Sequence, residues 1–546
     1  MSVQMVEINA QFVKEENLLV RIPISNKKFL VNLPGPIYRE NLKNDSLDLI
    51  ILPSQLQSIQ SQYPGLKVIP AAAELDDSDM ARDLTEALSF TKYPTYYQYD
   101  SMMHYFVNNY PSICMIDTFG FSVEGRLLLA IKISDNVHEE EDEPAFLYTA
   151  TMHGDELIGY ILSLRLIDFI LSSYGSNPEI DRIVNDVEIW INPLANPDYT
   201  YYGTNSSVAN STRPYFPDDY LNLNRGFPDP SAGDKNDTTD VYLENQYMML
   251  FMMEKKFNLS ANIHSGAEVV NYPWDYKFEL HPDDEWYKFI SREYADEAHV
   301  VNPNYMDDFQ DGISNGADWY VINGGRQDYV NHYLQGRELT LELSNIKKLA
   351  SESLESYWNY NQWSLINMIS QASYGIHGNV SDKNSGKSLQ AKIWIQNHDD
   401  ESSRIESDSV SGNFYRYLKE GIYTLIVSAN GYVADTIHDV EVIDYLRNKL
   451  NIQMLWEGTG IKEVFMMHPD IFPNPASEIV SIRFGNNSFH SILIQVYNTM
   501  GSLIYIGDCK AERDIFNLNV SEFDSGCYLI QITTGDQIYR HKLLIY

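Results

Sequence analysis

Short apolar strands alternate with helices between about residue 90 and residue 373, and this alternation constrains the fold more than any other feature of the chain. Two of the expected strands are residues 126–133 and 145–150, an apolar helix at 157–172 follows the second, and a further helix is expected at 100–109. Strands that alternate with helices favour a mixed or parallel sheet with helices on both faces. The central part of the chain is therefore expected to be an α/β domain.

Candidate metal ligands stand where two of these strands end. His153 and Glu156 follow the strand at residues 145–150, and His264 ends a second apolar segment at 259–264. In open α/β sheets, ligands bind beyond the carboxyl ends of the strands. Two histidines and a glutamate are the ligand set of a catalytic zinc ion that leaves one position open for water. The H-x-x-E pair alone is a weak signal, because such short patterns arise by chance.

A longer series of motifs raises the specificity of this signal. The segment from residue 90 to residue 372 resembles the zinc metallocarboxypeptidase family, and most closely its basic-specific regulatory branch, which includes carboxypeptidases N, E and D. The matching segments occur in the family's order and are residues 122–126, 153–156, 196–198, 223–228, 264 with 271–275, 312–317, 324–329 and 341–344. The resemblance implies a mixed eight-stranded carboxypeptidase sheet flanked by helices.

The resemblance implies a zinc site with a nearby base. His153, Glu156 and His264 would bind one zinc ion, and Glu342 would act as general base toward the water that the ion activates. Glu342 belongs to an alternating stretch, residues 337–343, in which every second side chain shares one face. A carboxylate that faces the metal fits this pattern, and a solvated edge strand is the alternative reading.

Four further residues match positions that hold the substrate in the family. Asn224 and Arg225 resemble the pair that receives the substrate's terminal carboxylate, which an arginine can bind with two parallel hydrogen bonds. Arg213 is the best match to the arginine that polarises the scissile carbonyl, although the loop at 214–222 is longer than the family's and a plain loop arginine is the alternative. Tyr320 matches a mobile tyrosine that closes over the substrate, and a core tyrosine is the other reading.

Two residues predict the preferred substrate side chain. Asp275 and Gln327 match the basic-specific branch, in which the acidic residue pairs with a C-terminal lysine or arginine. The alternative is that Asp275 only caps a loop. Two residues depart from the family. Asp155 stands between the metal ligands where Asn or Arg is usual, and Asn222 stands before the Leu-Asn-Arg motif where an acidic residue is usual. Both bear on substrate preference and rate more than on the reaction.

The remaining segments predict three appended domains. Residues 1–80 read as a small α/β domain, either a prosegment or a fixed accessory domain, and the catalytic domain is expected at 84–373. Residues 374–457 show short strands and turns and look like the transthyretin-like β-sandwich that follows the catalytic domain in this branch. Residues 465–546 form a second β-rich unit, which resembles the C-terminal sorting domain of type IX secretion.

Composition excludes several classes of protein. The net charge of −37 excludes nucleic-acid binding, and no apolar run reaches the roughly 18 residues of a membrane span. Three cysteines cannot make a thiolate zinc site, and at most Cys509 and Cys527 pair. The first 25 residues lack the apolar core of a secretion signal. The sorting resemblance therefore implies a secreted or surface protein that engages the secretion machinery, with the signal peptide absent from this numbering.

Three functions are compatible with the motifs. The preferred one is a zinc carboxypeptidase that releases C-terminal Lys or Arg from peptides. A zinc acyl-amino-acid hydrolase or a peptidoglycan-trimming carboxypeptidase shares the metal ligands but acts on another amide. An inactive binding or adhesion protein that keeps the scaffold is the alternative from a different class.

Overall fold

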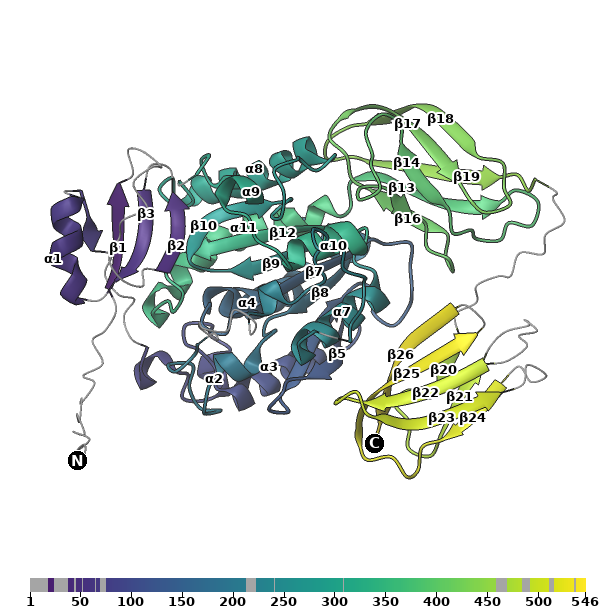
Figure 1. Cartoon of the computed structure of the whole chain (residues 1–546), viewed down its shortest axis with the longest axis horizontal. Coiled ribbons are helices and arrows are strands. Elements are labelled where there is room, and N and C mark those ends of the chain that lie inside the picture. The colour runs from purple at the N-terminus through teal and green to yellow at the C-terminus, as the bar shows by residue number, and fades with distance from the viewer. Residues whose placement is uncertain are drawn as a thin grey trace, which may run out of the picture.

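The arrangement of sheets divides the protein into a large central unit and smaller units at its ends (Figure 1). The computed structural model describes residues 18–23, 38–43, 46–51, 53–63, 65–68, 75–212, 222–239, 241–307, 309–457, 469–483, 492–509, 515–534 and 537–546. Arg213 lies outside the described residues.

The N-terminal unit is an antiparallel sheet with one helix. Its strands run in the order β2-β3-β1-β4, and α1 (Pro53–Gln62) follows β3 in the chain. The strands are β1 (Leu18–Pro23), β2 (Tyr38–Lys43), β3 (Ser46–Ile51) and β4 (Lys67–Val68). Strand β2 was not expected from the sequence, because its polar side chains do not show the apolar pattern of a buried strand.

The central unit contains the expected eight-stranded mixed sheet, which is confirmed. Its order is β11-β10-β12-β9-β7-β8-β6-β5, with parallel pairing from β8 through β7 and β9 to β12. The strands are β5 (Cys114–Phe121), β6 (Leu127–Ile133), β7 (Ala145–Ala150), β8 (Glu188–Asn192), β9 (Leu259–His264), β10 (Ala267–Tyr272), β11 (Ile313–Asn315) and β12 (Arg337–Ser344).

Helices cover both faces of this sheet (Figure 1). One core joins the sheet to α3, α4, α5, α8 and α11, and a second core joins the opposite face to α7 and α10. The helices are α2 (Leu84–Ala87), α3 (Tyr96–Asn109), α4 (Ile158–Ser173), α5 (Pro178–Asp186), α6 (Pro197–Thr200), α7 (Leu243–Lys255), α8 (Asp284–Val301), α9 (Gly316–Trp319), α10 (Arg326–Tyr333) and α11 (Leu354–Gln371). Short 3₁₀ turns are η2 (Asp77–Asp79), η4 (Leu223–Arg225) and η5 (Ser351–Ser353).

Helix α3 begins four residues earlier than the predicted helix at 100–109. The side chain of Thr95 accepts a hydrogen bond from the backbone of Gln98, whose side chain accepts one from the backbone of Thr95. This reciprocal capping box satisfies two backbone donors at the helix start. In the described part of the chain no single helix is long and apolar enough to span a membrane, and α4 and α5 reach that length only as a pair bent by 104°.

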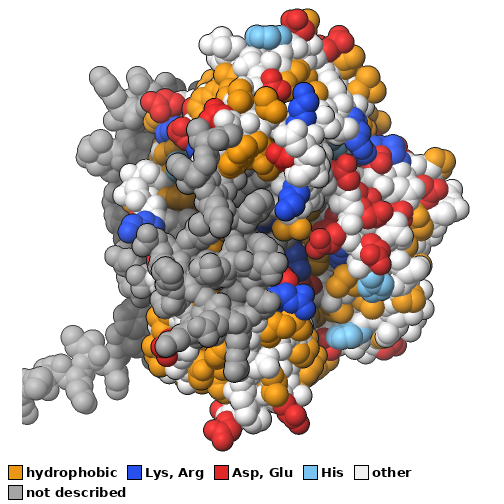
Figure 2. Space-filling view, turned by 90° about the vertical axis from the view of Figure 1, so that its right-hand side faces the viewer, with side chains coloured by type: hydrophobic (Ala, Val, Ile, Leu, Met, Phe, Trp, Pro, Cys, Tyr) orange, Lys and Arg blue, Asp and Glu red, His pale blue; other side chains and the backbone are white. Residues whose placement is uncertain are grey.

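Two sandwiches follow the central unit. In the first, the sheets β16-β13-β19 and β15-β14-β17-β18 enclose one apolar core, and in the second, β20-β21-β24 and β23-β22-β25-β26 enclose another. The strands are β13 (Gly375–Asp382), β14 (Lys392–Ile395), β15 (Ile405–Glu406), β16 (Asn413–Arg416), β17 (Gly421–Ser428), β18 (Asp435–Val442), β19 (Arg447–Met454), β20 (Asp470–Phe472), β21 (Ile479–Arg483), β22 (Ile492–Asn498), β23 (Leu503–Cys509), β24 (Ile515–Asn519), β25 (Gly526–Thr534) and β26 (Gln537–Ile545). Acidic side chains are spread over the described part of the face shown in Figure 2, in keeping with the net charge of −37.

A buried ionic cluster joins the first sandwich to the central unit. Asp283, the residue before α8, pairs with Arg337 at 2.8 Å and with Arg416 at 2.7 Å, and Arg416 also pairs with Asp399 at 2.5 Å. Burial alone would raise the pKa of Asp283, but the guanidinium groups of Arg416 and Arg337 outweigh it and hold that pKa below its ordinary value. Because Arg337 begins β12, the cluster fixes the strand that carries Glu342.

The second sandwich contacts strand β5, at one edge of the sheet. Lys542 donates a hydrogen bond of 3.1 Å to the backbone oxygen of Thr118 in β5 and lies 3.7 Å from Asp117. Cys527 is a free, buried thiol in the core that contains Tyr247 of α7. Cys527 therefore forms no disulfide, and the side chain of Cys509 lies outside the described residues.

Removal of the carboxylate shared by the two arginines should destabilise both units together. We expect Asp283→Ala to lower the free energy of unfolding by about 3–5 kcal/mol, because it leaves buried guanidinium groups without their partner. Urea denaturation followed by circular dichroism measures this loss. The exposed pair of Arg82 and Glu86 supplies the control, since Arg82→Ala should leave the midpoint unchanged. Equal midpoints for the two variants would contradict the structural role of the cluster.

Candidate metal centre

Two neighbouring parallel strands deliver the three predicted metal ligands. His264 ends β9, and His153 and Glu156 lie in the turn that follows β7. Thr151 begins this turn with a φ of 58°, a left-handed conformation that is rare for a β-branched residue, and its hydroxyl donates to the backbone oxygen of Pro193 at 2.8 Å. A Cβ on Gly154 would stand 2.3 Å from the backbone of Tyr199, so only glycine fits there.

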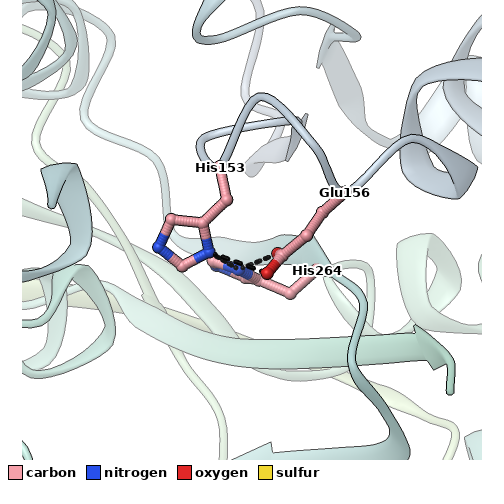
Figure 3. Close-up of side chains that lie close together, drawn as sticks. All are labelled: His153, Glu156 and His264. Atoms are coloured by element: carbon pink, nitrogen blue, oxygen red, sulfur yellow. Dashed lines mark hydrogen bonds and ion pairs between the residues drawn. The ribbon is translucent and has the colours of Figure 1, made fainter. Parts of the chain in front are cut away.

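The three ligand side chains converge on one point (Figure 3). His153 Nδ1 lies 3.0 Å from Glu156 Oε1, His264 Nδ1 lies 2.9 Å from Glu156 Oε2, and the two Nδ1 atoms are 3.2 Å apart. Their exposed fractions are only 8, 3 and 2% for His153, Glu156 and His264. A tetrahedral zinc ion with bonds of about 2.0–2.1 Å requires ligand atoms about 3.3 Å apart, so this donor set fits zinc.

Glu342 lies beside the metal group on the next strand. It pairs in register with His264 across the parallel strands β12 and β9, and residues paired in this way point their side chains to the same face of the sheet. The predicted strand alternation is thus observed, and Glu342 is partly buried rather than on a solvated edge. A carboxylate in this position can exchange a proton with a water molecule held near the ligands.

A buried polar row runs beneath the metal group. Thr149 of β7, Asn262 of β9, Thr340 of β12 and Asn271 of β10 pair in register across four adjacent strands. The hydroxyl of Thr149 donates to Asn262 Oδ1 at 2.9 Å, and the Asn262 amide lies 2.5 Å from His264 Nε2. His264 projects from the same face of the sheet as this row, and its contact with Asn262 restrains the imidazole ring.

A fully buried ion pair extends this network. Arg326 Nε and Nη2 each donate to a carboxylate oxygen of Glu338 at 2.8 Å, and Ser260 donates to the same carboxylate at 2.7 Å. The backbone N–H of Arg326 donates to Asn224 Oδ1 at 2.9 Å. Sequence reasoning assigned no role to Arg326 or Ser260. The sequence does contain a signal for this network. In residues 260–264 and 338–342, every second residue is polar within a strand that is otherwise apolar.

Asn224 and Arg225 lie together in the short turn η4. Arg225 Nη1 donates to the backbone oxygen of Asn224 at 2.8 Å, and both side chains are partly exposed. Tyr320, at the end of α9, is 44% exposed and packs edge-on against Trp319, with 4.9 Å between the two ring centres. It is therefore a surface residue rather than a core tyrosine.

Asp275 is buried among polar side chains, with an exposed fraction of 4%. Its Oδ1 accepts hydrogen bonds from Asn271 at 2.9 Å and from Gln327 at 3.0 Å, so the two residues predicted to read the substrate side chain are in contact. A Cβ on Gly316 would stand 1.8 Å from this oxygen. Burial raises the pKa of Asp275 to about 6, while Asn271 and Arg225 lower it.

A second buried carboxyl group supports Asp275 from below. Asp328 Oδ1 accepts the backbone N–H of Asp275 at 3.0 Å. Burial first, and the negative charge of Asp275 second, raise the pKa of Asp328 well above its ordinary value. Asp328 belongs to the motif at residues 324–329, but sequence reasoning assigned it no role, because its contact with Asp275 depends on the return of α10 to the loop after β10.

Comparisons with known proteins agree with the fold and the metal group. The zinc carboxypeptidase model matches residues 99–364, and the secretion system C-terminal sorting domain model matches residues 470–546. The sorting domain implies a secreted or cell-surface protein. A crystal structure of thrombin activatable fibrinolysis inhibitor is similar in fold, with a TM-score of 0.53 at 14% identity over 65% of this chain and 98% of that one.

Curated relatives carry carboxypeptidase names. Carboxypeptidase SOL1 of Arabidopsis thaliana is 32% identical over 362 residues, which cover 64% of this chain and 70% of that protein. Human carboxypeptidase D is 34% identical over 350 residues, 60% of this chain but only 24% of its own length. The chain thus spans about a quarter of that longer relative. On the match of its central unit and the similarity to these relatives, the chain belongs to the zinc carboxypeptidase family.

Proposed function

We propose that this protein releases C-terminal arginine or lysine from peptides, with one zinc ion bound by His153, Glu156 and His264. The family assignment supports the reaction, and the buried Asp275 supports the basic preference. The comparisons do not favour an acyl-amino-acid hydrolase, a peptidoglycan-trimming enzyme or an inactive binding protein.

The chemistry divides between the metal and the side chains around it. Zinc supplies activation of a water molecule and polarisation of the scissile carbonyl. Glu342 takes the proton that the attacking water loses and passes it to the nitrogen of the leaving amino acid. The register of Glu342 with His264 supports this role.

Asn224 and Arg225 hold the terminal carboxylate of the substrate. The guanidinium of Arg225 makes charge-assisted hydrogen bonds to it, and the hydrogen bond between Asn224 Oδ1 and the backbone of Arg326 fixes the orientation of the Asn224 amide. Arg213 polarises the carbonyl together with zinc, and Tyr320 closes over the bound residue. Both of these last roles come from the family resemblance alone.

Unpaired acceptor atoms around Asp275 support a basic side chain. Asn271 Oδ1 and Gln327 Oε1 are buried and have no hydrogen-bond donor among the described residues. An apolar substrate side chain would leave both unpaired, at a cost of about 1–3 kcal/mol for each such group. A guanidinium offers five N–H donors and an ammonium three, so arginine satisfies these acceptors best.

The appended units have proposed roles as well. The first sandwich, described over residues 375–454, is a transthyretin-like domain, and the second carries the protein to the secretion machinery. The N-terminal unit is either a prosegment or a fixed accessory domain. Comparison of the full chain with a variant that begins at Leu84 distinguishes these two, since only removal of a prosegment raises activity.

Loss of the Asp275 carboxylate should change specificity more than rate. We expect Asp275→Ala to lower kcat/KM for a peptide that ends in arginine by about 100-fold, because the guanidinium loses its buried partner. The kcat/KM for a matched peptide that ends in phenylalanine should change less than threefold, which corresponds to roughly 0.6 kcal/mol in activation free energy. Asp318→Ala, which removes an exposed carboxylate from the neighbouring helix α9, is the control and should change neither value. Unchanged arginine release in Asp275→Ala would refute the basic preference.

The preference should also depend on pH. As pH falls through about 6, Asp275 gains a proton and loses its attraction for a cation, so the ratio of kcat/KM for arginine over phenylalanine should fall. The ratio removes the contribution of the catalytic base, which is common to both substrates. Asp328, Arg225 and Glu338 also act on Asp275 and shift the midpoint. A ratio that stays constant between pH 5 and pH 8 would contradict the assignment.

A further inference from the structure

One amide oxygen connects the metal group to the turn that carries Asn224 and Arg225. Asn222 Oδ1 lies 2.9 Å from His153 Nε2 and accepts the backbone N–H of Asn224 at 3.0 Å. Asn222 is the N-cap of η4, the 3₁₀ turn that contains both proposed carboxylate-binding residues. The same atom thus contacts a metal ligand and the turn that would hold the substrate.

The geometry of His153 determines the direction of its hydrogen bond. Its Nδ1 faces Glu156 Oε1 and His264 Nδ1, so Nδ1 is the nitrogen that would bind zinc. A neutral imidazole whose Nδ1 lone pair binds a metal carries its proton on Nε2. His153 Nε2 is therefore the donor and Asn222 Oδ1 the acceptor, which selects this tautomer and fixes the ring orientation.

The acceptor is a neutral amide where the family resemblance leads one to expect a carboxylate. A carboxylate partner would raise the basicity of the imidazole and strengthen its bond to zinc. An amide oxygen orients the ring without adding a charge. The second imidazole has a different neighbour, because the amide nitrogen of Asn262 lies 2.5 Å from His264 Nε2.

We propose that Asn222 is a positioning residue whose side-chain oxygen both orients His153 for zinc and holds the turn that contains Asn224 and Arg225. Zinc affinity and recognition of the substrate carboxylate then depend on one oxygen atom. The part that concerns the carboxylate rests on the function proposed above, whereas the part that concerns zinc does not. Because an amide is a weaker acceptor than a carboxylate, the site holds zinc less tightly than an aspartate variant would.

Three variants of the full chain test this proposal. Asn222→Ala removes both hydrogen bonds, and Asn222→Asp keeps both acceptor positions and adds a charge. Asn177→Ala is the matched control, because Asn177 caps α5 in the same way. Its Oδ1 accepts a hydrogen bond of 3.0 Å from the backbone N–H of Glu179, two residues later. Zinc affinity is measured by competition with a chelator of known affinity, in the absence of substrate.

The proposal predicts opposite effects of the two substitutions at Asn222. Asn222→Ala should weaken zinc binding by about 10–100-fold, and Asn222→Asp should strengthen it by about tenfold. Asn177→Ala should leave zinc affinity unchanged. At saturating zinc, Asn222→Ala should raise KM for a peptide that ends in arginine by about tenfold, while Asn222→Asp restores the wild-type KM to within about threefold.

Each contrary result overturns a defined part of the proposal. Zinc affinities of Asn222→Ala and Asn177→Ala within twofold of each other would remove the link to His153. A weaker affinity with unchanged KM would remove the link to the substrate turn. If Asn222→Ala does not fold, Asn222→Asp decides alone, since zinc affinity no higher than wild type overturns the proposal. If the wild type releases no C-terminal residue, the proposed function fails, and the zinc affinities still decide the link to His153.

Discussion

The meeting of three buried ligand side chains is the constraint on which the rest of the site depends. His153, Glu156 and His264 come within 3.2 Å of one another because β7 and β9 are adjacent and parallel, so both strands end at the same edge of the sheet. Two imidazoles and a carboxylate in so small a space, largely shielded from water, are stable when they share a cation. The left-handed turn at Thr151 is the local feature that directs His153 and Glu156 back over the strand ends.

The polar face beneath these ligands is what makes their geometry definite. Apolar side chains form the opposite face of the same strands, whereas this face carries Asn262, Thr340 and the fully buried pair of Arg326 with Glu338. A buried ion pair contributes little net stability but has a defined geometry, and breaking it costs several kcal/mol (about 3–5). One chain of contacts thus runs from Asn262, beside His264, through Thr149 and Arg326 to Asn224.

Sequence reasoning found the parts of this site that have local motifs. The eight-stranded sheet is confirmed. His153, Glu156 and His264 lie together, Glu342 pairs in register with His264, and Asp275 contacts Gln327. It could not find contacts that depend on how a distant helix packs, as for Arg326 and Asp328 of α10 with Thr149 and Asp275. The early start of α3 was missed because its evidence is a capping pair, Thr95 and Gln98, outside the apolar pattern.

The central claim is metal-dependent release of single residues from free C-termini. The most direct test is mass spectrometry of the products from two peptides, one ending in arginine with a free carboxylate and the other in arginine amide. Each peptide is incubated with the zinc-loaded enzyme, with the enzyme after chelation, and with Glu342→Gln, a variant that keeps the metal ligands. We predict loss of one arginine from the free acid and no product from the amide, from the chelated enzyme or from Glu342→Gln. Internal fragments, or equal release from the amide and after chelation, would contradict the account.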